Sequence, residues 1–107
     1  MVTPDAVDII RVLETRLSAV GTRERAEREK RYLKSDLAFL GASVWQIEAV
    51  VKEVARQHRE LAHDELVALT VELWRAPIHE RRMAAVMFLE RFADRLSPRD
   101  LPLLERL

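Results

Sequence analysis

Residues that favour the start of a helix recur along this chain at intervals of about one helix. Few residues are therefore left for other secondary structure. A Ser or Thr suited to the N-cap precedes four segments with helical spacing of apolar residues, at Thr3, Thr22, Ser43 and Ser97. Gln46 follows Ser43 at the position that completes a capping box, and Pro4 and Pro98 occupy first helical positions. The chain has only two glycines, and its β-branched runs are short. The sequence therefore predicts an all-α fold.

Apolar residues spaced three and four positions apart divide the chain into about six predicted helices. The second is predicted to run from Arg23 to about Leu40, because Gly41 suits the left-handed residue that follows a helix end. Pro77 should end the fourth, which starts near Asp64. The others are predicted over residues 4–20 and from residues 44, 79 and 98 onward. Short connections between helices favour antiparallel pairs.

A weak internal repeat has an offset of about 35 residues. The segment 64–66 and Leu69 are echoed by 99–101 and Leu104, and Val51 is echoed by Val86. Such a period lies within the range of HEAT and related units, so we predict a HEAT-like α-solenoid. The last helix carries apolar residues that nothing downstream covers, at Leu103, Leu104 and Leu107. We expect a chain truncated within a larger fold, or self-association through this end.

Composition limits the classes of function. The length of 107 residues suits one domain, and 18 basic residues balance 18 acidic ones. A nucleic-acid site would therefore depend on local charge asymmetry. The chain has no cysteine, no apolar segment of membrane-spanning length and no signal-peptide pattern, so we expect a cytoplasmic protein without a membrane partner.

The segment 23–34 holds six Arg or Lys residues and three Glu residues, followed closely by an apolar run. One interpretation is a solvated helix face with internal ion pairs, Glu24–Arg28 and Glu27–Arg31. The other is a phosphate-contacting edge beside the only tyrosine, formed by Lys30, Arg31, Tyr32 and Lys34.

The remaining polar and aromatic candidates favour structural roles. The three histidines, at positions 58, 63 and 79, do not have the spacing of metal ligands, so no metal site is predicted. Glu80 is expected to cap its own helix, where the macrodipole favours a carboxylate. Trp74 is expected in the core, and Trp45 is equally compatible with core and surface. The chain has no glycine-rich phosphate loop or nucleophile motif, and no cofactor is predicted.

Two motifs resemble one known family. Arg31-Tyr32-Leu33-Lys34 followed by Phe39-Leu40-Gly41 is similar to the R-Y-[LM]-K…FLG signature of the DNA alkylation repair family, the AlkD-like HEAT-repeat DNA glycosylases. The segment 72–80, ELWRAPIHE, followed by Ala84-Ala85, resembles the ELW-x-x-P-x-x-E…AA block of that family. The two motifs occur in the same order and at a fitting separation. The resemblance covers about residues 23–107, the N-terminal half of the family's fold.

The resemblance implies an α-solenoid that cradles alkylated duplex DNA on a basic concave face. Family members of the glycosylase type excise N3- and N7-alkylated purines with a carboxylate flanked by tryptophans, which lies downstream of the matched segment. No catalytic residue is therefore predicted here. Tyr32 matches the tyrosine that lines the lesion cleft, and Ser43 stands where a relative has glutamine near the duplex. Arg82 is a further candidate for contacting DNA.

We therefore interpret residues 1–107 as the N-terminal part of an AlkD-like domain, and we expect it to be truncated at its C-terminal end. It should bind duplex DNA weakly and be inactive by itself. The alternative is a HEAT-like protein-interaction module that does not bind DNA. Salt dependence distinguishes the two, because phosphate contacts release counterions.

Overall fold

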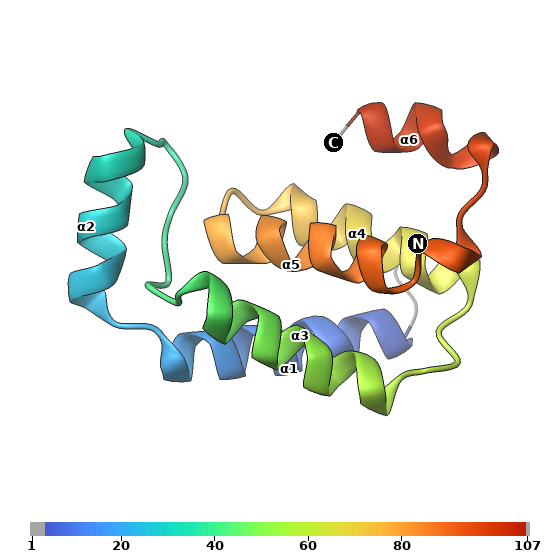
Figure 1. The fold of residues 1–107 in the computed structure, drawn as a ribbon, viewed down its shortest axis with the longest axis horizontal. Helices are drawn as coiled ribbons and strands as arrows, with labels where there is room; N and C mark the ends of the chain where they lie inside the picture. Colours follow the sequence, from blue (N-terminus) through green and yellow to red (C-terminus); the bar gives the residue numbers. More distant parts are fainter. Residues whose placement is uncertain (1–3, 107) are drawn as a thin grey trace.

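The computed structural model describes residues 4–106, and within them the chain is all-α, as predicted (Figure 1). The helices are α1 (Pro4–Val20), α2 (Arg23–Leu33), α3 (Val44–Gln57), α4 (His63–Arg75), α5 (His79–Arg91) and α6 (Leu101–Glu105). Two 3-10 turns, Ala93–Arg95 and Pro98–Asp100, precede α6. The only β-type pairing among the described residues is one isolated bridge between Ala38 and Ile78. The predicted cap Thr3 and the predicted apolar Leu107 lie outside the described residues.

Four helices form two antiparallel pairs that stack on each other. Figure 1 shows α1 antiparallel to α3 and α4 antiparallel to α5, and α1 contacts α4 while α3 contacts α5. The core between them is mainly aliphatic, and Phe88 and Phe92 are also buried in it. Its fully buried members include Ile9, Leu13, Leu17, Ile47, Val51, Val54, Leu66, Leu69, Leu73, Ala84, Ala85 and Phe88. Burying these side chains against a second layer is what gives such short helices their stability.

The 35-residue offset is present in the structure, although not every echoed residue is equivalent. Helix α3 begins at Val44 and its neighbour α5 begins at His79, which is 35 positions later. Val51 is buried, whereas Val86, its counterpart by sequence, is 43% exposed. Ala85 and Phe88 fill the core in that region instead, because α5 turns a different face toward α3 and α4.

Helix α2 lies outside the two pairs, at one end of the molecule (Figure 1). It has no buried residue, and it ends at Leu33 rather than near Leu40, so the predicted boundary was wrong. Lys34 takes the left-handed conformation with φ 50°, and its N–H donates to the carbonyl of Arg31 at 3.3 Å. Gly41 also has a positive φ, of 85°, but for a different contact described below. Residues 35–43 form a non-helical segment, which we call the extended segment, because its backbone bonds to Pro77, His79 and Glu80 instead of continuing the helix.

The last predicted helix forms in two parts. At the predicted start, the N–H of Ser97 donates to the carboxylate of Asp100 at 2.8 Å, and the chain then makes one 3-10 turn before α6. Leu101 is 53% exposed, while Leu103 and Leu104 are half-buried. No helix in the described part of the chain is both long and apolar enough to cross a membrane.

Candidate nucleic-acid interface

The extended segment 35–43 connects α2 to the helical body through backbone bonds. The N–H of Ala38 donates to the carbonyl of Pro77 at 2.9 Å, and the N–H of His79 donates to the carbonyl of Ala38 at 2.9 Å. The ring of Phe39 stacks on that of His79, with 4.6 Å between centroids. These contacts hold the segment against the N-terminal end of α5.

Glu80 is the strongest of these connections. Its side chain is fully buried, and its carboxylate accepts bonds from the N–H groups of Leu40 at 2.8 Å, Gly41 at 3.0 Å and Ala42 at 3.2 Å. The expectation that Glu80 caps its own helix was therefore wrong. A buried carboxylate needs several donors, and the extended segment supplies three that would otherwise be unpaired.

Two glycines allow the chain to cross itself where α2 begins. A Cβ atom at Gly21 would overlap the carbonyl group of Leu40, and one at Gly41 would overlap that of Thr22. The N–H of Thr22 donates to the carbonyl of Gly41 at 3.1 Å, and its hydroxyl accepts from the N–H of Arg25 as the predicted N-cap. The two backbone segments approach too closely for a side chain to fit between them, so this crossing holds the start of α2 in place.

The predicted edge on α2 is solvent-exposed. Tyr32 is 84% exposed, and its neighbours Arg31 and Lys34 are exposed as well. Lys30 is also exposed, but its ammonium donates to the carbonyl of Leu37 at 2.7 Å and so braces the extended segment.

The ion pairs on α2 differ from the predicted ones. They are Arg23–Glu27 at 3.4 Å and Arg25–Glu29 at 2.7 Å, in place of Glu24–Arg28 and Glu27–Arg31. Glu27 has an arginine four positions away on both sides, and it pairs with the earlier one. Among the described residues, Arg31 and Lys34 form no ion pair. The C-terminal half of α2 therefore keeps unneutralised positive charge.

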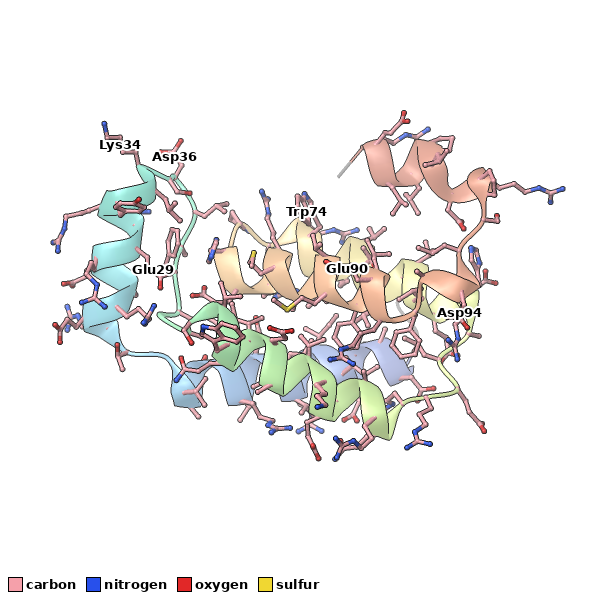
Figure 2. All side chains as sticks on the ribbon, viewed as in Figure 1. Glu29, Lys34, Asp36, Trp74, Glu90 and Asp94 are labelled. Atoms are coloured by element: carbon pink, nitrogen blue, oxygen red, sulfur yellow. The ribbon has the colours of Figure 1, made fainter. Side chains whose placement is uncertain are left out.

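Ser43 and Arg82, the other two predicted DNA contacts, have structural partners. The hydroxyl of Ser43 accepts from the N–H of Gln46 at 3.1 Å, which confirms the predicted capping box. Ser43 is the last residue of the segment 35–43, whereas Lys34 directly precedes that segment. Arg82 donates to the carbonyl of Trp74 at 3.2 Å, and its guanidinium lies 5.1 Å from the centre of that ring. Figure 2 shows Trp74 and Lys34 on the same edge of the molecule.

A second cationic surface, which the sequence did not predict, lies between α3 and α5. We call it the α3–α5 basic groove; its charged lining is Lys52, Arg56, Arg59, Arg91, Arg95 and Asp94. Arg95 bonds to the carboxylate of Asp94 at 3.1 Å and to the carbonyl of Arg59 at 2.6 Å. Among the described residues, Lys52 and Arg91 form no ion pair. Five cations thus line a groove with one carboxylate, but Arg56 also pairs with Glu53 at 3.7 Å, just outside the lining.

Trp45 lies on the first turn of α3 and is 81% exposed. It lines a shallow depression with Glu48, Ala49, Lys52 and Arg91. The structure therefore places Trp45 at the surface, whereas Trp74 packs partly against the core, as predicted.

His63 joins the start of α4 to the turn before α6. Its Nδ1 bonds to Asp64 at 2.9 Å and its Nε2 bonds to Asp100 at 2.7 Å, and Asp100 also accepts from the N–H of Ser97 at 2.8 Å. The bond to Asp100, followed by that to Asp64, raises the pKa of His63. The bond from His63, followed by that from Ser97, lowers the pKa of Asp100. Within residues 4–106, no group of three or more His, Asp or Glu side chains is placed to hold a metal ion.

The comparisons with known proteins agree with the two motifs. A search of curated proteins gave no significant match. A family model described as DNA alkylation repair enzyme matches residues 13–107, which is most of the chain. This chain belongs to the DNA alkylation repair enzyme family.

Proposed function

We propose that this chain is a DNA-binding helical scaffold, built from HEAT-like helix pairs, that acts in the repair of alkylated duplex DNA. The observation that carries the proposal is the α3–α5 basic groove, which is lined by five cations although the chain as a whole is neutral. Arg56 and Arg95 are ion-paired with Glu53 and Asp94, and the other three cations form no ion pair among the described residues. Local charge of this kind attracts a phosphate backbone even on a protein without net charge. The groove supplies a row of positions for the phosphates of a duplex.

The exposed end of α2 is proposed as a second contact with the duplex. Tyr32, Arg31 and Lys34 are exposed there, and the crossing at Gly21 and Gly41 holds α2 in place. Lys30 contributes mainly by bracing the extended segment, since its ammonium is bonded to Leu37. Ser43 and Arg82 remain predicted contacts whose polar groups also have structural bonds.

The chemistry of the family fits a scaffold role for this segment. An N3- or N7-alkylated purine is cationic and therefore a good leaving group, so an enzyme needs a carboxylate that stabilises the developing sugar cation. Glu80 and Asp100 have other bonds, to the extended segment and to His63. Glu48 lies near Trp45, but in an open, solvated depression beside two cations. We therefore propose that the 107-residue chain by itself releases no base.

Salt titration of duplex binding tests the DNA-binding function. The logarithm of the binding constant should fall with the logarithm of salt concentration by about 0.9 per phosphate contact. Replacing both Lys52 and Arg91 by Gln should reduce this slope by about 1.8, since two contacts are lost. The matched control is Arg11→Gln, because Arg11 is exposed on α1 and paired with Asp8. Binding that does not depend on salt, or an equal change in the control, would contradict the proposal.

Base release tests the chemistry separately. The chain is incubated with duplex containing N7-methylguanine, and free base is measured against a protein-free control. We expect only the spontaneous rate. Release above it that Glu48→Gln abolishes would show that Glu48 is a catalytic carboxylate and that the scaffold role is incomplete.

A second candidate function is a protein contact through α6, including contact between copies of this chain. It is favoured by Leu101, which is 53% exposed, next to the half-buried Leu103 and Leu104. Burying an apolar patch of this kind favours association. Sedimentation equilibrium at micromolar concentration would detect a dimer that Leu101→Asp weakens. A monomer at every concentration would remove the self-association.

A further inference from the structure

The depression that holds Trp45 and the α3–α5 basic groove are continuous. Lys52 and Arg91 line both of them, so the two cations lie between the exposed ring and the rest of the groove. A ligand that follows the cations toward the N-terminus of α3 would therefore meet the indole ring.

Helical geometry places the ring and the cations of α3 along one stripe. Lys52 follows Trp45 by seven residues, and Arg56 follows it by eleven. These intervals are close to two and three turns, so the side chains project from the same side of α3, about 10 Å and about 16 Å along its axis from Trp45. An aromatic ring followed by regularly spaced cations is the arrangement that binds a base and its neighbouring phosphates.

The charges in the depression determine which part of such a ligand each position favours. Lys52 and Arg91 have no ion-pair partner among the described residues, so they are available to phosphates. Glu48 lies in the same depression and disfavours phosphate directly beside it. A nucleobase is uncharged, so it can approach the Trp45 end where a phosphate would be repelled.

We propose that Trp45 is a stacking site for an unpaired nucleobase, with Lys52 and Arg91 binding the adjacent phosphates. The inference rests on the proposed binding of DNA and adds to it a preference for DNA with a base outside the duplex stack. A paired base offers no free face to the ring, whereas a bulged or displaced base does. A solvent-exposed ring on a fixed helix turn is ready for stacking without any rearrangement.

The test compares two DNAs at one salt concentration: a continuous duplex, and the same duplex with a single unpaired thymine. We expect the bulged duplex to bind about tenfold more tightly, the size typical of stacking one base on an aromatic ring. Trp45→Ala should abolish this preference and leave binding to the continuous duplex unchanged. Trp45→Phe should keep part of it, because a phenyl ring still stacks. Both changes are at an exposed side chain, so the fold is retained.

Fluorescence gives an independent readout. In a Trp74→Phe variant the only indole is Trp45, and its emission should be quenched by the bulged duplex but not by the continuous one. Equal binding of the two DNAs, or equal weakening of both by Trp45→Ala, would overturn the stacking inference while leaving DNA binding intact. If neither DNA binds, the proposed function fails and the inference fails with it.

Discussion

Replacing Glu80 by Gln should destabilise the fold strongly although the two side chains have nearly the same shape. The carboxylate accepts from Leu40 through Oε1, and from Gly41 and Ala42 through Oε2. An amide has only one accepting oxygen, so it can keep two of these bonds at most, and its NH₂ group then faces the third N–H.

The magnitude follows from those bonds. Leaving one partly buried N–H unpaired costs about 1–3 kcal/mol, and losing the charge from the two remaining bonds costs about 1 kcal/mol more. The free energy of unfolding should therefore fall by about 2–4 kcal/mol. For a domain of roughly this size, that corresponds to a Tm lower by about 10–25 °C.

Urea and thermal unfolding followed by circular dichroism measure the effect. Hydrogen exchange at the amides of Leu40, Gly41 and Ala42 should accelerate in the variant, and this would localise the loss of stability to that segment. Glu65→Gln is the matched control, because Glu65 is also near a helix start but accepts one exposed bond, from Ala62 at 3.2 Å. The control substitution should lower the free energy of unfolding by about 1 kcal/mol or less. A Glu80→Gln protein as stable as the control would refute the reasoning.

Three further changes test other parts of the structure. Gly41→Ala should lower the free energy of unfolding by about 2 kcal/mol or more, because φ is 85° and the new Cβ would overlap the carbonyl of Thr22; urea unfolding measures it. Ser43→Ala removes the N-cap of α3 and should cost about 1 kcal/mol in the same assay, with no cost contradicting the capping role. The contact between His63 and Asp100 should depend on pH. The pKa of His63 is raised above 6.5, so this stabilisation is full below pH 6.5 and is lost as pH rises through the higher, folded-state pKa. The pKa of Asp100 is lowered below 3.8. The stabilisation that the ionised Asp100 contributes is therefore full above pH 3.8, and it is lost as pH falls through the lower, folded-state pKa. Amide exchange in residues 97–105 should be slowest between these limits, and His63→Gln should flatten its dependence on the alkaline side.

The sequence by itself determined the features whose bonds span only a few residues. Thr22 and the Ser43–Gln46 capping box could be identified because a cap bonds to an N–H two or three positions later. The helical spacing of the core residues in α1 and α3 was equally local, since one helix face is defined by its own sequence. The exposed cations around Tyr32 could be named for the same reason, as neighbours along one helix.

Only the tertiary structure decided where α2 ends, what Glu80 does and where the α3–α5 basic groove lies. The apolar run at residues 37–40 continued the helical pattern, but Glu80, up to 40 positions away, draws that segment into an extended path. The α3–α5 basic groove combines residues from 52 to 95, and no short run of the sequence is basic there. The sequence placed Trp74 in the core but left Trp45 equally compatible with core and surface, and the packing of α3 decides that Trp45 is exposed. In each case the outcome depends on which helix faces meet, and local spacing does not specify that.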